Sequence, residues 1–211
     1  VRGDRVVTDD KANTGGAGQT DVASAAKMRA PGRHPTERLT PLPGAVPDFV
    51  PKEPDEFLAA LLQGFEDDAE LIDSHGQDVV RLEPGRWLEF AQAAHDAGFE
   101  VCVDITGVDW FRHRSPRFEV VANLLSHQHR RRLRVILPVP EEDPHVSSVV
   151  SVWPGASFAE RETFDMFGIV FDDHPDLTRI LMPDDWEGHP LRKDYNVGAV
   201  PVQFKGNRKA T

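Results

Sequence analysis

Three segments in the middle of the chain alternate apolar and polar or small side chains. Apolar residues occupy every second position over 99–105, 118–125 and 133–137. Pro138 and Pro140 end the third segment, because proline lacks the N–H that a strand ladder requires. This alternation is typical of antiparallel strands with one face toward solvent.

The preceding residues predict two helices and a hairpin. Pro54, Asp55 and Glu56 precede the apolar run FLAALL and form a helix start, and Gly64 ends that helix. Short apolar runs at 71–72 and 79–82 flank a His-Gly turn and indicate a hairpin or two strands. Apolar residues at helical spacing predict a second helix over 85–97.

Two further helices are expected after the strands. Residues 145–153 are compatible with a short helix, and Ser157 is expected to cap another over 158–167. Together the elements predict an α+β fold: a single core with a mainly antiparallel sheet, helices packed on it, and extended N- and C-terminal segments.

The composition changes near both ends. Residues 1–53 are expected to form an extended or disordered Pro/Gly-rich tail, because seven of the 24 residues from 31 to 54 are proline. An alternative is a strap over a partner, anchored by Leu42, Val46, Phe49 and Val50. The α+β core is expected over 54–187. Residues 188–211 carry five basic residues and one acidic residue and predict an extended basic arm.

The overall composition excludes several classes of protein. The chain has 211 residues and a net charge of −11, which argues against a protein that coats nucleic acid. There is no run of 18 apolar residues, so no membrane-spanning helix is expected, and the start shows no signal-peptide pattern. A single cysteine, Cys102, can form no internal disulfide and cannot hold an iron–sulfur cluster by itself, so a cytosolic or cytosol-facing protein is expected.

Charge is distributed unevenly along the core. Residues 112–134 contain seven arginines and one acid, whereas residues 160–187 contain nine acids and two arginines. The basic segment has few aromatic residues, and the acidic segment would repel phosphate. Opposed segments of this kind favour docking between subunits, or pairing with each other, over binding of nucleic acid.

The densest polar run, 160–169, has two interpretations. Glu162 and Asp165 share one face of the predicted helix, and paired carboxylates can serve acid–base catalysis. Arg161 shares a face with Asp165 as well, so a structural salt-bridge network is the alternative. The network is favoured, because no nucleophile with an adjacent base is evident.

His127 and His129 would lie on one face of a strand, as metal ligands can. Three arginines follow directly, and their positive charge opposes cation binding. A solvated strand end is therefore favoured. No metalloprotease, serine-hydrolase, P-loop or dinucleotide-binding motif occurs in the sequence.

The run ERETFDMFGIVFDDHPDLTRILMPDDWEGHPLRKDY, residues 160–195, resembles the signature of the C subunit of NADH–quinone oxidoreductase, the thirty-kilodalton subunit of respiratory complex I. The segments 106–110 and 154–156 also resemble family positions, so the resemblance covers about residues 54–196. Asn196 departs from the family, in which many members have proline at this position.

The resemblance implies a non-catalytic scaffold subunit of the peripheral arm, located on the cytoplasmic face of the bacterial plasma membrane. The expected partners are the D subunit (the forty-nine-kilodalton type), which helps to form the quinone pocket, and the B and I subunits; membrane contact would occur only through partners. This chain would hold no cofactor, while FMN, iron–sulfur clusters and quinone would reside on partner subunits. The alternative is the equivalent subunit of a membrane-bound hydrogenase or of another quinone-reducing dehydrogenase.

Two sets of residues follow from the resemblance. The expected structural network consists of Glu160, Arg161, Glu162, Asp165, Phe167, Gly168, His174, Pro175 and Arg179. The expected docking residues are His189, Pro190, Leu191, Arg192, Lys193, Asp194 and Tyr195. No catalytic, cofactor-binding or metal-binding residue is expected.

Overall fold

The computed structural model describes residues 50–196. The expected tail up to residue 49, with the strap anchors Leu42, Val46 and Phe49, lies outside the described residues. The same is true of the arm beyond Asn196. The fourth proposed anchor, Val50, belongs to a short edge strand and is 57% exposed.

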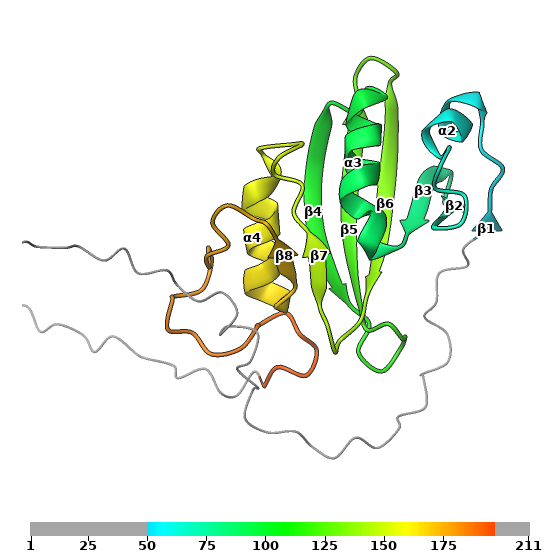
Figure 1. The fold of residues 1–211 in the computed structure, drawn as a ribbon. Helices are drawn as coiled ribbons and strands as arrows, with labels where there is room; N and C mark the ends of the chain where they lie inside the picture. Colours follow the sequence, from blue (N-terminus) through cyan, green and yellow to red (C-terminus); the bar gives the residue numbers. More distant parts are fainter. Residues whose placement is uncertain (1–49, 197–211) are drawn as a thin grey trace, which may run out of the picture.

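A six-stranded sheet forms the centre of the molecule (Figure 1). Its strands are β1 (Val50–Pro51), β2 (Ala69–Ser74), β3 (Gln77–Leu82), β4 (Val101–Asp109), β5 (Phe118–Ser126) and β6 (Arg131–Val139). The spatial order is β1-β2-β3-β6-β5-β4, and every pair is antiparallel except β3 with β6. The three long strands match the predicted alternation, with ends that differ by at most four residues.

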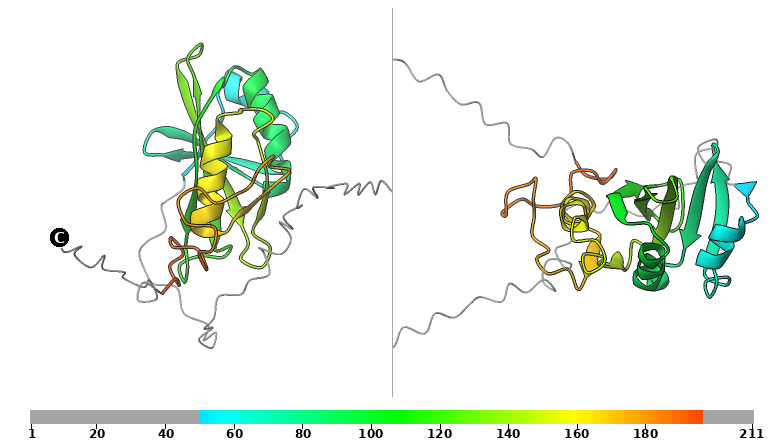
Figure 2. Two further views of the ribbon diagram at one scale, coloured as in Figure 1. Left: turned by 90° about the vertical axis from the view of Figure 1, so that its left-hand side faces the viewer. Right: turned by 90° about the horizontal axis from the view of Figure 1, so that it is seen from above.

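Helices pack on this sheet from different sides. The helices are α2 (Glu56–Leu61), the 3₁₀ turn η1 (Pro84–Arg86), α3 (Trp87–Asp96) and α4 (Ala156–Phe167). Seen from above in Figure 2, α3 covers one sheet face, while α4 and α2 lie toward opposite ends of the sheet. The predicted α+β class with a mainly antiparallel sheet is confirmed.

The core lies between α3 and the sheet. Trp87, Phe90, Ala91 and Ala94 of α3 are all fully buried and form the inner face of this helix. On the sheet side, alternate residues of β5 and β6 are buried against them, such as Val120 with Leu137 across the strand pair. Burial of this one face fixes the register, because a slip by one residue would expose every core side chain.

Helix α4 protects the edge strand β4. The Thr163 hydroxyl donates to the carbonyl of Ile105 at 3.1 Å, which gives one edge carbonyl a partner. Because an uncovered strand edge invites pairing with other chains, α4 removes that hazard at this side of the sheet. The same packing places the polar run of α4 beside the end of the sheet.

The prediction of a helix over 145–153 is wrong. Residues His145–Ser147 form strand β7, which pairs in parallel with β8 (Val170–Asp172), and a turn follows. Pairing with β8 determines that this segment is a strand, and it buries Val146 against the core. Helix α4 also begins at Ala156, before the expected cap Ser157, and Gly155 precedes it without a side-chain cap.

Candidate functional site

The carboxylate of Asp165, on the last turns of α4, holds the loop that follows strand β8. One oxygen, Oδ2, accepts the backbone N–H groups of Ile180, Leu181 and Met182 at 3.1, 2.8 and 2.8 Å. Burial alone would raise the pKa of Asp165. The three N–H donors and the guanidinium of Arg179 outweigh burial and lower this pKa below its ordinary value. Asp165 is therefore a buried, charged anchor.

Arg179 completes this anchor from the loop side. Its Nη1 donates to Asp165 Oδ1 at 2.6 Å, and its Nη2 donates to the carbonyls of Trp186 and Gly188 at 3.0 and 3.1 Å. A planar guanidinium can make these bonds simultaneously, whereas a lysine ammonium has no such fork. Arg179 thus joins α4 to two later points of the chain.

The expectation that Arg161 neutralises the acids of α4 is wrong. Arg161 donates instead to the carbonyls of Thr178 and Arg179, at 3.1 and 3.2 Å. Glu162 is exposed, so it does not form a buried carboxylate pair with Asp165. Sequence spacing showed which residues share a helix face, but the partner of Asp165 comes from outside the helix.

Glu160 belongs to a second, separate cluster. Its carboxylate accepts the Ser148 hydroxyl at 2.6 Å and the Val149 N–H at 2.8 Å, and burial raises its pKa. His174 Nε2 lies 3.9 Å from the same carboxylate, while its Nδ1 accepts the N–H of Asp176. This cluster fixes the turns before α4 and after β8, and exposed Pro175 follows His174 in the second turn.

The expected docking residues begin by folding back onto the core. His189 Nδ1 donates to the carbonyl of Asp165 at 2.9 Å, and the N–H of Leu191 donates to the carbonyl of Met166 at 3.0 Å. Arg192 donates to the carbonyl of Phe167, the last residue of α4. This end of the helix is therefore closed by residues more than 20 positions later.

Close packing of His189 and Arg192 against the end of α4 explains why residue 168 is glycine. Gly168 has φ +71, and a Cβ atom there would lie 2.5 Å from the His189 ring and 2.6 Å from Arg192 Nη2. The left-handed conformation and the lack of space both require glycine.

Arg117 holds the next part of the segment. Its Nε and Nη2 form a paired contact with Asp109 at 2.9 and 2.7 Å, and its Nη1 and Nη2 contact Asp194 at 3.1 and 2.7 Å. Nη1 also donates to Glu141 at 3.0 Å, and the backbone N–H of Lys193 donates to Asp109 Oδ2 at 2.8 Å. Burial opposes the charge of Arg117, but Asp109 and Asp194 outweigh it and raise the pKa of this guanidinium.

Exposed apolar side chains lie on the two segments that Arg161 joins, and we name this set the apolar patch. We define it by Phe158, Ile180 and Leu181, which are 66%, 37% and 55% exposed. Arg161 links its parts, because it contacts the loop carbonyls at 178 and 179 and lies 6.0 Å from the Phe158 ring centre. Leu191, from the expected docking set, is 50% exposed as well. Sequence reasoning missed the patch, although Phe158 precedes a run of charged helix residues.

Comparison with known proteins identifies the family of the chain. The family model described as "Respiratory-chain NADH dehydrogenase, 30 Kd subunit" matches residues 80–200. The chain belongs to this family. The C subunit of NADH-quinone oxidoreductase from Salinispora tropica is 45% identical over 72% of the chain and 65% of the relative. The protein of the same name from Mycolicibacterium gilvum is 39% identical over 80% and 79%.

Some relatives are considerably longer than the shared region. The chain spans 54% of the corresponding protein of a Nocardioides species, to which it is 54% identical over 62% of its own length. A solved trypsin-resistant fragment of Nqo5 is 35% identical, has a TM-score of 0.53, and aligns over 57% of the chain and 99% of the fragment. A chain of an archaeal membrane-bound sulfane sulfur reductase shares the fold at 21% identity, with a TM-score of 0.60 and coverage of 74% and 97%.

The two histidines and the cysteine singled out in the sequence of this 30-kDa family member lie in different surroundings. His127 contacts Glu100 at 2.9 Å, whereas the His129 ring packs 4.7 Å from the ring of Phe57, so the two histidines have different neighbours. Across residues 50–196, no group of three His, Cys, Asp or Glu side chains could hold a metal ion. Burial raises the pKa of the Cys102 thiol to about 12, which disfavours the reactive thiolate.

Three of the seven arginines in segment 112–134, namely Arg114, Arg117 and Arg131, form ion pairs within the described residues. Arg114 pairs with Glu119, and Arg131 contacts both Asp55 and Asp78. The acids that these three arginines contact all lie outside the acidic segment 160–187, and Asp194, a partner of Arg117, lies just beyond it. No helix among the described residues is both long and apolar enough to cross a bilayer.

Proposed function

We propose that the chain is a non-catalytic scaffold subunit in the peripheral arm of proton-translocating NADH–quinone oxidoreductase. It docks on the D subunit beside the quinone-reducing module, with the B and I subunits as further neighbours. It lies on the cytoplasmic face of the membrane and contacts the membrane only through these partners. FMN, the iron–sulfur clusters and quinone belong to the partner subunits.

The observation that carries this proposal is how four charged residues near the end of the sheet and α4 are used. Asp165, Arg179, Asp109 and Arg117 all bind other parts of the same chain, through contacts of 2.6–3.1 Å. An acid–base catalyst needs a titratable group that can reach a substrate. These groups instead stabilise the loop and the start of the arm, so structure is the role that they support.

This rigid framework favours docking. Anchoring by Asp165 fixes the backbone next to Ile180 and Leu181, whose side chains remain exposed. Exposed apolar residues on a fixed backbone lose little conformational freedom when a partner covers them, which favours binding. Full burial of a large apolar side chain contributes about 1.5–3 kcal/mol, and these partly covered side chains contribute a fraction of that when a partner buries them. The patch therefore supports a contact with a partner subunit.

The start of the arm has a fixed direction. Asp194 is held by Arg117, and Tyr195 packs close to Gly188, where a Cβ would approach its ring to 2.9 Å. A segment that leaves the core from a fixed point reaches a neighbour with a smaller entropic cost than a freely moving tail. Residues 188–195 thus serve first as an internal clasp and then as the base of the proposed arm.

Purification through a tag on this chain tests the proposal. Mass spectrometry should find the flavin-bearing NADH-input subunits together with the B, D and I subunits. Co-purification of a nickel–iron hydrogenase pair without NADH-input subunits would instead establish the alternative. Turnover by the purified single chain would contradict the scaffold role.

A further inference from the structure

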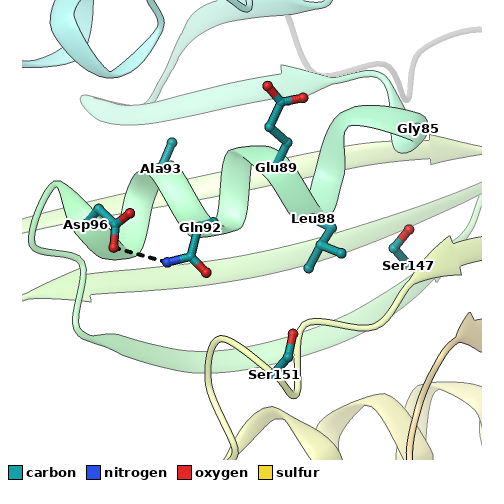
Figure 3. A pocket seen from close by; sticks show the side chains of 8 residues that line it. All are labelled: Gly85, Leu88, Glu89, Gln92, Ala93, Asp96, Ser147 and Ser151. Carbon is teal, nitrogen blue, oxygen red and sulfur yellow. Dashed lines mark hydrogen bonds between the residues drawn. The ribbon is translucent and has the colours of Figure 1, made fainter.

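A groove runs along the outer side of α3. It lies between this helix and the turn after β7, and its volume is about 760 Å³. Figure 3 shows Leu88, Gln92 and Asp96 along the helix and Ser147 and Ser151 on the opposite side. A second hollow of about 330 Å³ shares Leu88, Ser147 and Ser151 and extends to Asp172 and Asp173. We call the two together the α3 groove.

The groove has an apolar contact point. Leu88 is 41% exposed, although the neighbouring apolar residues Trp87, Phe90 and Ala91 of the same helix are fully buried. Leu88, Gln92 and Asp96 are four residues apart, so they form one row along the helix. From Leu88 to Asp96 the helix rises about 12 Å, which matches three to four residues of an extended chain.

The walls of the groove are acidic. Glu89, Asp96, Asp172 and Asp173 line it, and no lysine or arginine is among its lining residues in the described part of the chain. Two of these charges are partly compensated, because Glu89 contacts Arg86 and Asp172 contacts His145. Within residues 50–196, the Asp96 carboxylate accepts a hydrogen bond from the neutral Gln92 amide at 3.0 Å and lies 3.6 Å from His95 Nδ1. The formal charge of the lining side chains is therefore negative at neutral pH.

We propose that the α3 groove binds an extended basic segment of a neighbouring subunit. This inference rests on the proposed function, because the neighbour is another subunit of the assembled complex. The segment places an apolar side chain over Leu88 and directs lysine or arginine toward Asp96 and toward the pair Asp172–Asp173. Opposite charge on the partner selects the segment and sets its register.

The groove is separate from the apolar patch. The patch belongs to α4 and to the loop after β8, whereas α3 covers a face of the sheet (Figure 1). The chain therefore has two contact surfaces of different chemistry. One is apolar and rigidly anchored, and the other is a negative groove suited to a positively charged extended segment.

Site-specific cross-linking in the purified complex tests the inference. A photo-reactive amino acid replaces Leu88, and the same residue placed at Val103, which is 54% exposed on β4, serves as the reference position. Cross-linked peptides are identified by mass spectrometry. The expected product joins position 88 to a peptide of another subunit with at least two lysines or arginines.

Charge reversal then tests whether the acidic residues of the groove attract the basic segment. Asp96→Lys should lower the cross-link yield at position 88 several-fold, whereas Glu70→Lys, at an exposed position outside the groove, should leave it unchanged. Raising the salt concentration should lower the yield for the unaltered groove, because salt screens exposed charges.

Three results would overturn the inference. The first is a cross-link from position 88 only to this chain itself, either to its own C-terminal segment or to a second copy. The second is a cross-link to a neighbouring subunit at a peptide without basic residues. The third is the absence of any cross-link in a complex that contains all its subunits. Failure of the complex to contain this chain would instead refute the proposed function, so the two failures are distinguishable.

Discussion

Arg117 and Asp194 are 77 residues apart in sequence and form a paired contact at 2.7 and 3.1 Å. Arg117 lies just before β5, and Asp194 lies in the segment that returns from α4. The contact ties the base of the proposed arm to the end of the sheet. It is stabilised by Asp109, which is buried beneath the same guanidinium.

Asp194→Ala should loosen this segment without unfolding the core. Trypsin cleavage after Arg192 and Lys193 should accelerate several-fold in the purified chain, measured by mass spectrometry over time. Glu141→Ala is the matched control, because Glu141 contacts the same guanidinium from the loop after β6. Equal cleavage rates for Asp194→Ala and the unaltered chain would show that the pair does not hold the segment.

Arg179→Ala should destabilise the fold more than Arg161→Ala. Loss of Arg179 leaves the buried charge of Asp165 without its cation, a change that costs about 3–5 kcal/mol. Arg161 makes two hydrogen bonds to carbonyls, which contribute about 1–3 kcal/mol together. Urea unfolding of both variants measures the difference, and a larger loss for Arg161→Ala would contradict the assignment of the anchor.

Gly168→Ala should cost at least about 2 kcal/mol, because it combines left-handed backbone strain with a collision against His189. Gly85→Ala is the control, since nothing lies within 4 Å of its Cβ position and its φ is not in the left-handed region. That change should alter the free energy of unfolding by less than about 1 kcal/mol. Thermal unfolding of both variants provides the comparison.

Acid should weaken the clasp through His189. Burial, followed by the charges of Arg192 and Arg179, lowers the pKa of His189 to about 4, while the carbonyl and charge of Asp165 oppose this shift. The unfolded chain therefore binds the proton more readily, with a pKa of about 6.5. The stability from neutral His189 is complete above about pH 6.5 and is lost as the pH falls toward about 4.

His189→Asn keeps an N–H donor for the Asp165 carbonyl but cannot titrate in this range. The unaltered chain should lose up to about 3 kcal/mol more than the variant between pH 7 and pH 4, at about 1.4 kcal/mol per pKa unit. Urea unfolding at several pH values measures both. Because burial also lowers the pKa of His174, the variant rather than the absolute pH dependence isolates His189. Parallel curves would contradict the prediction.

The local pattern of apolar residues predicted the central strands of the sheet. It could not predict which strands pair with each other when they lie far apart in the sequence. Alternation over 99–105 and 118–125 identified strands, since one buried face imposes a period of two. The same reasoning missed β7, because three residues are too few to show a period and their strand character depends on pairing with β8. The parallel contact of β3 with β6 likewise depends on tertiary packing.

The contacts of Asp165 and Arg117 also depend on residues that are distant in the sequence. The sequence identified Asp165 and Arg179 as members of a signature, but it assigned Arg161 as the cation for Asp165. Helix spacing reports neighbours on one helix, whereas the true partner lies 14 residues further along in a loop. Arg117 appeared only as part of a basic segment, because its partners at 109 and 194 meet it through the fold.

The central claim is that this chain assembles the complex and does not perform its chemistry. The most direct measurement is NADH–quinone activity per assembled complex in cells that carry Leu181→Asp, with complex quantified on native gels. Val103→Asp is the control, because Val103 is equally exposed but lies outside the apolar patch. Leu181→Asp should lower the amount of complex while activity per complex stays unchanged, and Val103→Asp should alter neither. Normal assembly with a collapse of activity per complex would contradict the account.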